Sequence, residues 1–112
     1  MEPLMTGKLY RAEIDRPIGY VDDFGNVYPV NYGFIPDIIA GDGEPQDVYI
    51  ISKHVNQPLD YFKGELAAII HRADDVEDKW VLTVAGQKLD RETIKEQTDF
   101  LEAYFDSKIE LL

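Results

Sequence analysis

The chain contains no cysteine, which excludes disulfide bonds and thiolate metal sites. It has only two histidines, His54 and His71, and neither belongs to a metal-binding motif. Zinc sites in proteins are built mainly from these two residue types. Their scarcity leaves carboxylates as the candidate metal ligands. The absence of cysteine also makes a cytoplasmic location the expectation.

Long apolar runs are missing too, as is any basic stripe. No stretch approaches the ~20 apolar residues of a transmembrane helix, and Met1–Leu4 lacks the basic and apolar regions of a signal peptide, so we expect no membrane partner. The chain carries 11 Lys and Arg against 22 Asp and Glu, for a net charge of −11. Nucleic-acid binding requires a basic surface. We therefore expect no nucleic-acid partner, and an anionic substrate would need cations between itself and this protein.

At 112 residues the chain is expected to form one domain, covering residues 1–112, with a modest core. Short apolar segments separated by turn residues predict a succession of strands, followed by an amphipathic helix at about 91–107 with Asp90 as its N-cap. The predicted strands are 8–14, 27–34, 47–52, 61–71 (bent at Gly64) and 80–84. This order is typical of a mainly β (α+β) fold, a small barrel with a C-terminal helix packed on it.

Three carboxylates, Asp42, Glu44 and Asp47, lie within six residues of one another. Crowded carboxylates repel each other and are costly to desolvate, so a bound cation is one reason for such a cluster. Oxygen ligands favour Mg²⁺, Mn²⁺ or Ca²⁺, and Mg²⁺ usually meets protein carboxylates together with substrate phosphates. The alternative is structural, because Asp42-Gly43 is also a common turn sequence.

The segment that contains this cluster resembles the signature of the soluble (family I) inorganic pyrophosphatases. That family combines Y-P-x-N-Y-G-[FY]-I with D-G-D-P-x-D, and the chain reads YPVNYGFI at 28–35 and DGEPQDV at 42–48. Weaker similarity continues to about Phe105. The resemblance implies an OB-like five-stranded barrel and hydrolysis of inorganic diphosphate with Mg²⁺ as cofactor, Mn²⁺ being the alternative.

The resemblance also implies roles for the clustered carboxylates. Asp42, Glu44 and Asp47 match metal-binding positions, and the middle one matches the residue that orients or deprotonates the attacking water. Glu44 replaces the family's aspartate there, and a shift of about 1 Å in a reacting group can cost roughly 100-fold in rate. Ligation by Asp42 and Asp47 is therefore the firmer prediction.

A second acidic segment, DDVED at 74–78, precedes the last predicted strand. On its own it reads as a solvated hairpin loop. By resemblance Asp78 matches a distal metal ligand, and the proximal ligand falls on Asp74 or Asp75, because a length difference of one residue prevents a choice.

Tyrosines are the next predicted site residues. By resemblance Tyr32 donates to a phosphate or a metal-bound water, and Tyr28 lies at the edge of the site. The segment FLEAYFD at 100–106 is similar to the family's F-F-E-x-Y-K-D, which assigns Tyr104 to substrate binding. Without the resemblance, buried tyrosines are equally well explained as core residues.

Basic residues depart most from the family pattern. Trp80 and Phe105 stand where the family has lysines. Lys79 is one position before Trp80, so it is predicted to point to the face of the strand opposite to position 80. Lys108 is a weak substitute for the second of these lysines. Arg16 is the best remaining phosphate ligand, although a surface salt bridge explains it equally well.

The leading hypothesis is Mg²⁺-dependent hydrolysis of inorganic diphosphate to two phosphates by a metal-activated water. Two alternatives remain: a metal-dependent phosphohydrolase acting on another small phosphoanhydride, and a degenerate, non-catalytic metal-binding module. Diphosphate is the expected small-molecule partner. Bacterial members of the family are often hexamers, so the resemblance implies a homo-oligomer.

Overall fold

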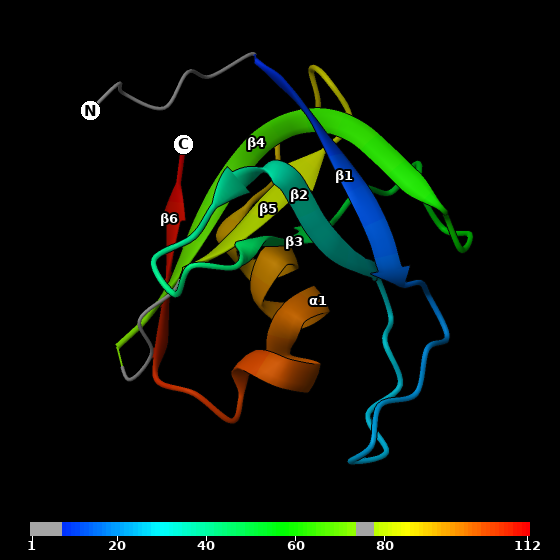
Figure 1. The fold of residues 1–112 in the computed structure, drawn as a ribbon, viewed down its shortest axis with the longest axis vertical. Coiled ribbons are helices and arrows are strands. Elements are labelled where there is room, and N and C mark those ends of the chain that lie inside the picture. Colours follow the sequence, from blue (N-terminus) through cyan, green and yellow to red (C-terminus); the bar gives the residue numbers. More distant parts are fainter. Residues whose placement is uncertain (1–7, 74–77) are drawn as a thin grey trace.

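The computed structural model describes residues 8–73 and 78–112. These residues form a closed β-barrel with one helix outside it (Figure 1). The elements, in chain order, are β1 (Leu9–Arg16), β2 (Asn31–Ile39), β3 (Pro45–Ile50), β4 (Tyr61–Arg72), β5 (Lys79–Thr83), α1 (Arg91–Glu102) and β6 (Ser107–Leu111).

The barrel closes because β1 pairs with both β2 and β4. The strand order is β1-β2-β3-β5-β4, and the first half of the long strand β4 returns to β1. All of these pairs are antiparallel except β3 and β5, which run parallel. The remaining strand, β6, pairs with the second half of β4 and extends the sheet beyond the barrel. The predicted five-stranded barrel is therefore confirmed.

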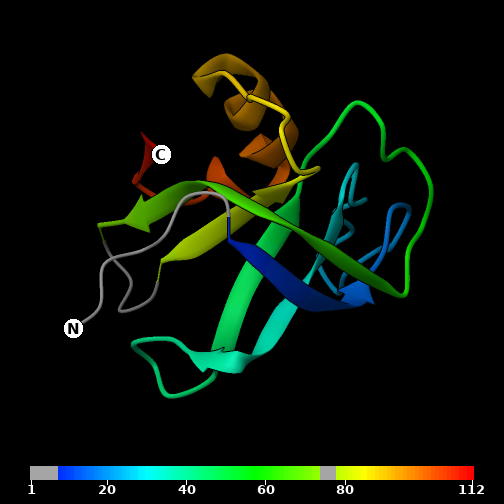
Figure 2. The same ribbon diagram turned by 90° about the horizontal axis from the view of Figure 1, so that it is seen from above.

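Side chains alternate between two cores along β3 and β5, as the strand period of two requires. One set fills the barrel and includes Val48, Ile50, Trp80 and Leu82. The opposite set includes Tyr49 and packs under α1, which covers this outer face of the barrel (Figure 2). Each strand of the parallel pair therefore has both faces buried.

The C-terminal helix is shorter than the sequence predicts. It begins after the Asp90 N-cap, as expected, but it ends at Glu102 rather than near residue 107. The prediction was wrong because apolar residues at three- and four-residue spacing continue past the end of the helix, while 107–111 pair with β4 as β6 instead. Tyr104 consequently lies in the connecting turn and Lys108 in a strand. Among the described residues, no helix is long and apolar enough to cross a membrane.

Asn31 anchors two long loops, the one between β1 and β2 and the one between β3 and β4. Its buried side-chain oxygen accepts hydrogen bonds from the backbone N–H groups of Ile18 and Leu59, both at 3.1 Å. Its amide group donates to the carbonyl of Gln57 at 3.0 Å. One side chain at the start of β2 thus fixes the β1–β2 loop relative to the β3–β4 loop, and the β1–β2 loop carries part of the site described below.

Gly33 allows β1 to approach β2 closely. A Cβ atom at this position would lie 1.8 Å from the backbone oxygen of Glu13. Overpacking of a core typically costs about 1–3 kcal/mol. We expect Gly33→Ala to destabilise the fold by at least this much, because the added Cβ atom clashes with backbone. Urea unfolding measures the change, with the exposed Ala85→Ser as a control. A Gly33→Ala protein as stable as the wild type would contradict the close approach.

Candidate functional site

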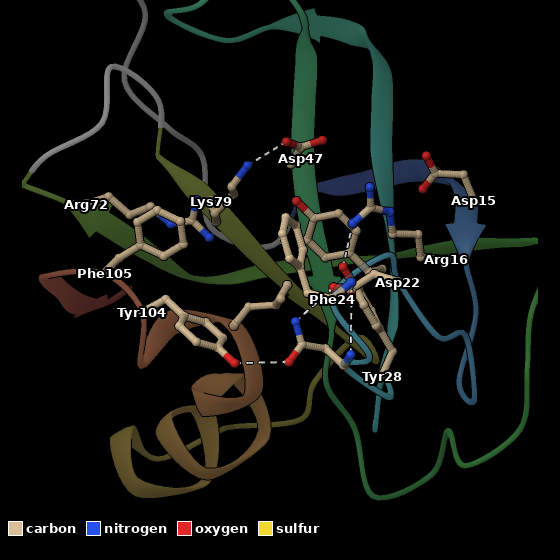
Figure 3. Close-up of a pocket in the computed structure, with 13 residues that line it drawn as sticks. Asp15, Arg16, Asp22, Phe24, Tyr28, Asp47, Arg72, Lys79, Tyr104 and Phe105 are labelled. Carbon is tan, nitrogen blue, oxygen red and sulfur yellow. Dashed lines mark hydrogen bonds and ion pairs between the residues drawn. The ribbon is translucent and has the colours of Figure 1, made fainter.

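A cavity of about 620 Å³ opens on the outer face of the barrel, beside the end of α1 (Figure 3). Residues from β1, the β1–β2 loop, β2, β3, β4, β5 and the turn after α1 surround it. Its lining carries three basic side chains, three carboxylates and a set of aromatic rings. The lining residues are Asp15, Arg16, Asp22, Phe24, Asn26, Tyr28, Tyr32, Asp47, Arg72, Lys79, Leu101, Tyr104 and Phe105.

The parallel pairing of β3 with β5 places Asp47 next to Lys79. Val48 is aligned with Trp80, so the preceding residues of the two strands both face outward into the cavity. The Lys79 ammonium lies 2.6 Å from the Asp47 carboxylate, and the lysine side chain is only 5% exposed. Burial in a low-dielectric site strengthens this ion pair and fixes both charges at the cavity wall.

Arg16 lies against a group of aromatic rings on the other side of the cavity. Its guanidinium donates a hydrogen bond to the Tyr28 hydroxyl and lies 5.9 Å from the centre of the Tyr32 ring. Burial disfavours the charge, but the hydrogen bond and the nearby tyrosines outweigh it, so the pKa of Arg16 is raised. Burial in turn raises the pKa of Tyr28. Arg16 therefore stays cationic and Tyr28 stays a neutral phenol at any physiological pH.

A buried ion pair supports the floor of the cavity. Arg72, at the end of β4, donates to Glu102 at the end of α1 through Nε, at 3.0 Å, and through a terminal nitrogen. Tyr49 donates its hydroxyl to the same carboxylate at 2.6 Å, and its own pKa is raised by burial and by that negative charge. The Arg72 guanidinium also stacks 3.8 Å from the centre of the Phe105 ring. This network ties the turn after α1 to β3 and β4.

The mouth of the cavity is formed by the β1–β2 loop and the turn after α1. Asp22 shapes the loop by accepting hydrogen bonds from the backbone of Phe24 and Asn26, both at 2.9 Å. Asn26 then accepts a hydrogen bond of 3.3 Å from the Tyr104 hydroxyl across the mouth, as Figure 3 shows. Phe24 is 90% exposed and Tyr104 is 71% exposed. Two aromatic side chains thus border the entrance.

Comparison with known proteins assigns the chain to a family. A sequence model described as inorganic pyrophosphatase matches residues 11–110. The chain belongs to the inorganic pyrophosphatase family. It is 33% identical over 108 residues to the inorganic pyrophosphatase of Rickettsia prowazekii, with 89% of this chain and 62% of the relative aligned. It is 34% identical to inorganic pyrophosphatase 1 of Pseudomonas syringae pv. tomato, with 80% and 55% aligned. The chain thus spans about half to three fifths of these relatives' length.

Solved inorganic pyrophosphatases share the fold. The structure from Ehrlichia chaffeensis superposes with a TM-score of 0.70 at 18% identity, covering 96% of this chain and 91% of that one. The structure from Helicobacter pylori superposes with a TM-score of 0.64 at 16% identity, covering 98% and 88%. At this identity the likeness supports the fold alone. It agrees with the barrel and helix described above.

The structure gathers only part of the site that the pyrophosphatase resemblance implies. Arg16, Tyr28, Tyr32, Asp47 and Tyr104 all line the cavity. Other predicted residues do not. Asp42 and Glu44 lie in the exposed β2–β3 turn, where Asp42 accepts a hydrogen bond from the Glu44 N–H at 3.0 Å. The Asp78 carboxylate lies 3.1 Å from His71, and Lys108 is exposed on β6. Asp74 and Asp75 fall outside the described residues. Their roles stay predictions.

The described carboxylates do not by themselves fit a metal cage. Within residues 8–73 and 78–112, no three His, Asp or Glu side chains come together in a way that could hold an ion. Asp47 is the one predicted ligand among them that lines the cavity, and it is paired with Lys79. Its oxygen chemistry suits Mg²⁺, but a single carboxylate is an incomplete site.

Two cations of the cavity were not assigned to the site from the sequence. The sequence pattern predicted Lys79 on the face of β5 opposite to position 80, away from the site. In the structure Trp80 turns into the barrel, so the opposite face, which carries Lys79, borders the cavity. Trp80, Val81 and Leu82 are consecutive apolar residues, so their pattern did not show which face Lys79 would take. Arg72 gave no signal, because its partner Glu102 is 30 residues away in sequence.

The buried Arg72–Glu102 pair should be sensitive to loss of one partner. We expect Arg72→Met to destabilise the protein by about 3–5 kcal/mol, because it leaves the Glu102 carboxylate buried without its counter-charge. Arg72→Met combined with Glu102→Gln should recover much of this loss. Urea unfolding of both single variants and the double variant measures the coupling. Additive losses would show that the two side chains do not stabilise each other.

His71 should make stability depend on pH. It lies 2.7 Å from Glu110 and 3.1 Å from Asp78, and the hydrogen bond that it donates to Glu110 is the largest cause that raises its pKa above 6.5. Its contribution is therefore complete below about pH 6.5 and is lost as the pH rises through the raised pKa. Melting temperatures of wild type and His71→Gln from pH 5 to 9 measure this. The difference between them should shrink at high pH, and a constant difference would contradict the ion pairs.

Proposed function

We propose that the chain hydrolyses inorganic diphosphate to two phosphates, as a single pyrophosphatase-like domain. The observation that carries the proposal is the pairing of Asp47 with a buried lysine in a cavity that also holds Arg16, Tyr28 and Tyr32. This arrangement puts cations and hydroxyl groups around one carboxylate, which suits a small polyanion that reacts with water. Membership of the inorganic pyrophosphatase family supports the same reaction.

Diphosphate would enter this cavity as its Mg²⁺ complex. The basic side chains in the lining, Arg16, Arg72 and Lys79, are balanced by Asp15, Asp22 and Asp47. Among the described lining residues the formal charges thus cancel, which does not by itself offset a highly charged diphosphate. Mg²⁺ usually binds one or two protein carboxylates together with substrate phosphates, so Asp47 would hold an ion that offsets this charge. Mn²⁺ has similar oxygen preferences.

The roles of the side chains follow from their positions. Arg16 and Lys79 offset negative charge on the phosphates, and Tyr28, Tyr32 and Tyr104 surround the same space. Asp47 orients the attacking water, because Lys79 holds its carboxylate in place at 2.6 Å. The water oxygen forms a bond to one phosphorus atom, the bond from that atom to the bridging oxygen breaks, and the second phosphate leaves with that oxygen.

Other predicted features stay part of the proposal. They are metal binding by Asp42, Glu44, Asp78 and Asp74 or Asp75, a base role for Glu44, substrate binding by Lys108, assembly into a homo-oligomer, and a cytoplasmic location. The two other functions also stay open: hydrolysis of a related phosphoanhydride, and metal binding without catalysis. Phosphate release from diphosphate, ATP and a phosphate monoester, each with Mg²⁺, Mn²⁺ or EDTA, separates these functions. Absence of release from any substrate would contradict the enzyme assignment.

Replacement of Asp47 tests the centre of the proposal. We expect Asp47→Asn to lower kcat for diphosphate by about 100-fold or more, because the amide keeps the shape of the side chain but loses its charge. The exposed Asp37→Asn on β2 is the matched control and should keep wild-type activity. Because Asp47→Asn removes a carboxylate that pairs with the buried Lys79, the Asp47→Asn/Lys79→Met double variant is the control for stability. Near-wild-type turnover in Asp47→Asn would exclude Asp47 from the reaction.

A further inference from the structure

The cavity is larger than inorganic diphosphate requires. Its volume of about 620 Å³ corresponds to roughly twenty water molecules at about 30 Å³ each. Diphosphate has two phosphorus and seven oxygen atoms, and it leaves much of this space unfilled even with a metal ion. Cavities of 300–1,000 Å³ are typical of sites for larger organic ligands. The volume therefore leaves room for an organic group attached to the phosphates.

The lining of the outer part of the cavity is aromatic. Phe24 is 90% exposed, Tyr104 is 71% exposed and Phe105 is 37% exposed, and all three border the same space. Single exposed apolar residues are ordinary, but several around the mouth of one pocket indicate a binding surface. Figure 3 shows that Phe24 comes from the β1–β2 loop while Tyr104 and Phe105 come from the turn after α1. Flat rings on two sides suit a planar aromatic ligand group.

Of the cations of the cavity, Arg72 contacts the Phe105 ring, whereas Lys79 and Arg16 lie on strands rather than in the loop and the turn that carry the exposed rings. Lys79 is buried on β5, and Arg16 lies half-buried against Tyr28 and Tyr32. The exposed rings lie in the loop and turn at the mouth. A ligand with phosphates at one end and an aromatic ring at the other would match this distribution.

We propose that the cavity also binds and cleaves nucleoside diphosphates, with the base stacked on Phe24 and Tyr104 and the phosphates beside Arg16 and Lys79. The inference rests on the proposed phosphoanhydride hydrolysis. The water oxygen bonds to the terminal phosphorus, and the bond from that atom to the bridging oxygen breaks. The nucleoside monophosphate leaves with the bridging oxygen, and the proton lost by the water passes to solvent. No oxidant, reductant or second substrate is required.

Phosphate release and binding with ADP, diphosphate and inorganic triphosphate, all with Mg²⁺, test the proposal. Phe24→Ser removes the most exposed ring, and Phe24→Tyr restores a ring. Val21→Ser is the matched control, because Val21 lies in the same loop, is 56% exposed and does not line the cavity. Phe24→Ser removes the ring on which the base is proposed to stack. We therefore expect about tenfold weaker ADP binding in this variant. Diphosphate KM should change less than about twofold, and Phe24→Tyr and Val21→Ser should behave as wild type.

The outcomes separate this inference from the proposed function. Hydrolysis of diphosphate without binding of ADP, or equal losses for both ligands in Phe24→Ser, would overturn the inference and leave the proposed function intact. ADP binding that depends on Phe24, without hydrolysis of either ligand, would support the binding surface and overturn the proposed hydrolysis. Size-exclusion chromatography tests whether a second copy of the chain, rather than a nucleotide, covers the exposed rings. Dissociation of an oligomer by Phe24→Ser, with no ADP binding in the wild type, would identify the rings as an interface and overturn the inference.

Discussion

The parallel pairing of β3 with β5 is the constraint on which the rest of the structure depends. It completes the barrel between strands that are far apart in the chain, and its register aligns Val48 with Trp80. That alignment buries one set of side chains inside the barrel and turns the other set toward α1 and the cavity. A shift of one residue in either strand would exchange the two sets, so the Asp47–Lys79 pair exists only in this register.

The cavity gathers basic side chains in a chain whose net charge is −11. Its basic residues are few, but Arg16, Arg72 and Lys79 converge on one space. Each is held by a specific partner: the Tyr28 hydroxyl, Glu102 and Asp47 respectively. Partial burial makes each of these charges act more strongly than it would on an open surface. The local arrangement therefore matters more for binding than the overall charge.

The chain departs from its family where the C-terminal segment meets the cavity. A lysine was expected at position 105, and the chain has a phenylalanine whose ring packs against the Arg72 guanidinium. The cation thus comes from β4 rather than from the turn after α1, and the turn contributes an aromatic surface instead. Phe24 and Phe105 thus give the mouth of the cavity an aromatic character.

The sequence by itself determined the barrel, its five strands, the start of the helix and the family, because alternation, turn residues, the Asp90 cap and the YPVNYGFI motif are local signals. Only the tertiary structure decided where the helix ends, since pairing with β4 turned 107–111 into a strand. It also decided that Lys79 and Arg72 line the cavity and that Asp42 and Glu44 do not. These facts depend on strand register and on contacts between residues distant in the chain, which no local pattern encodes.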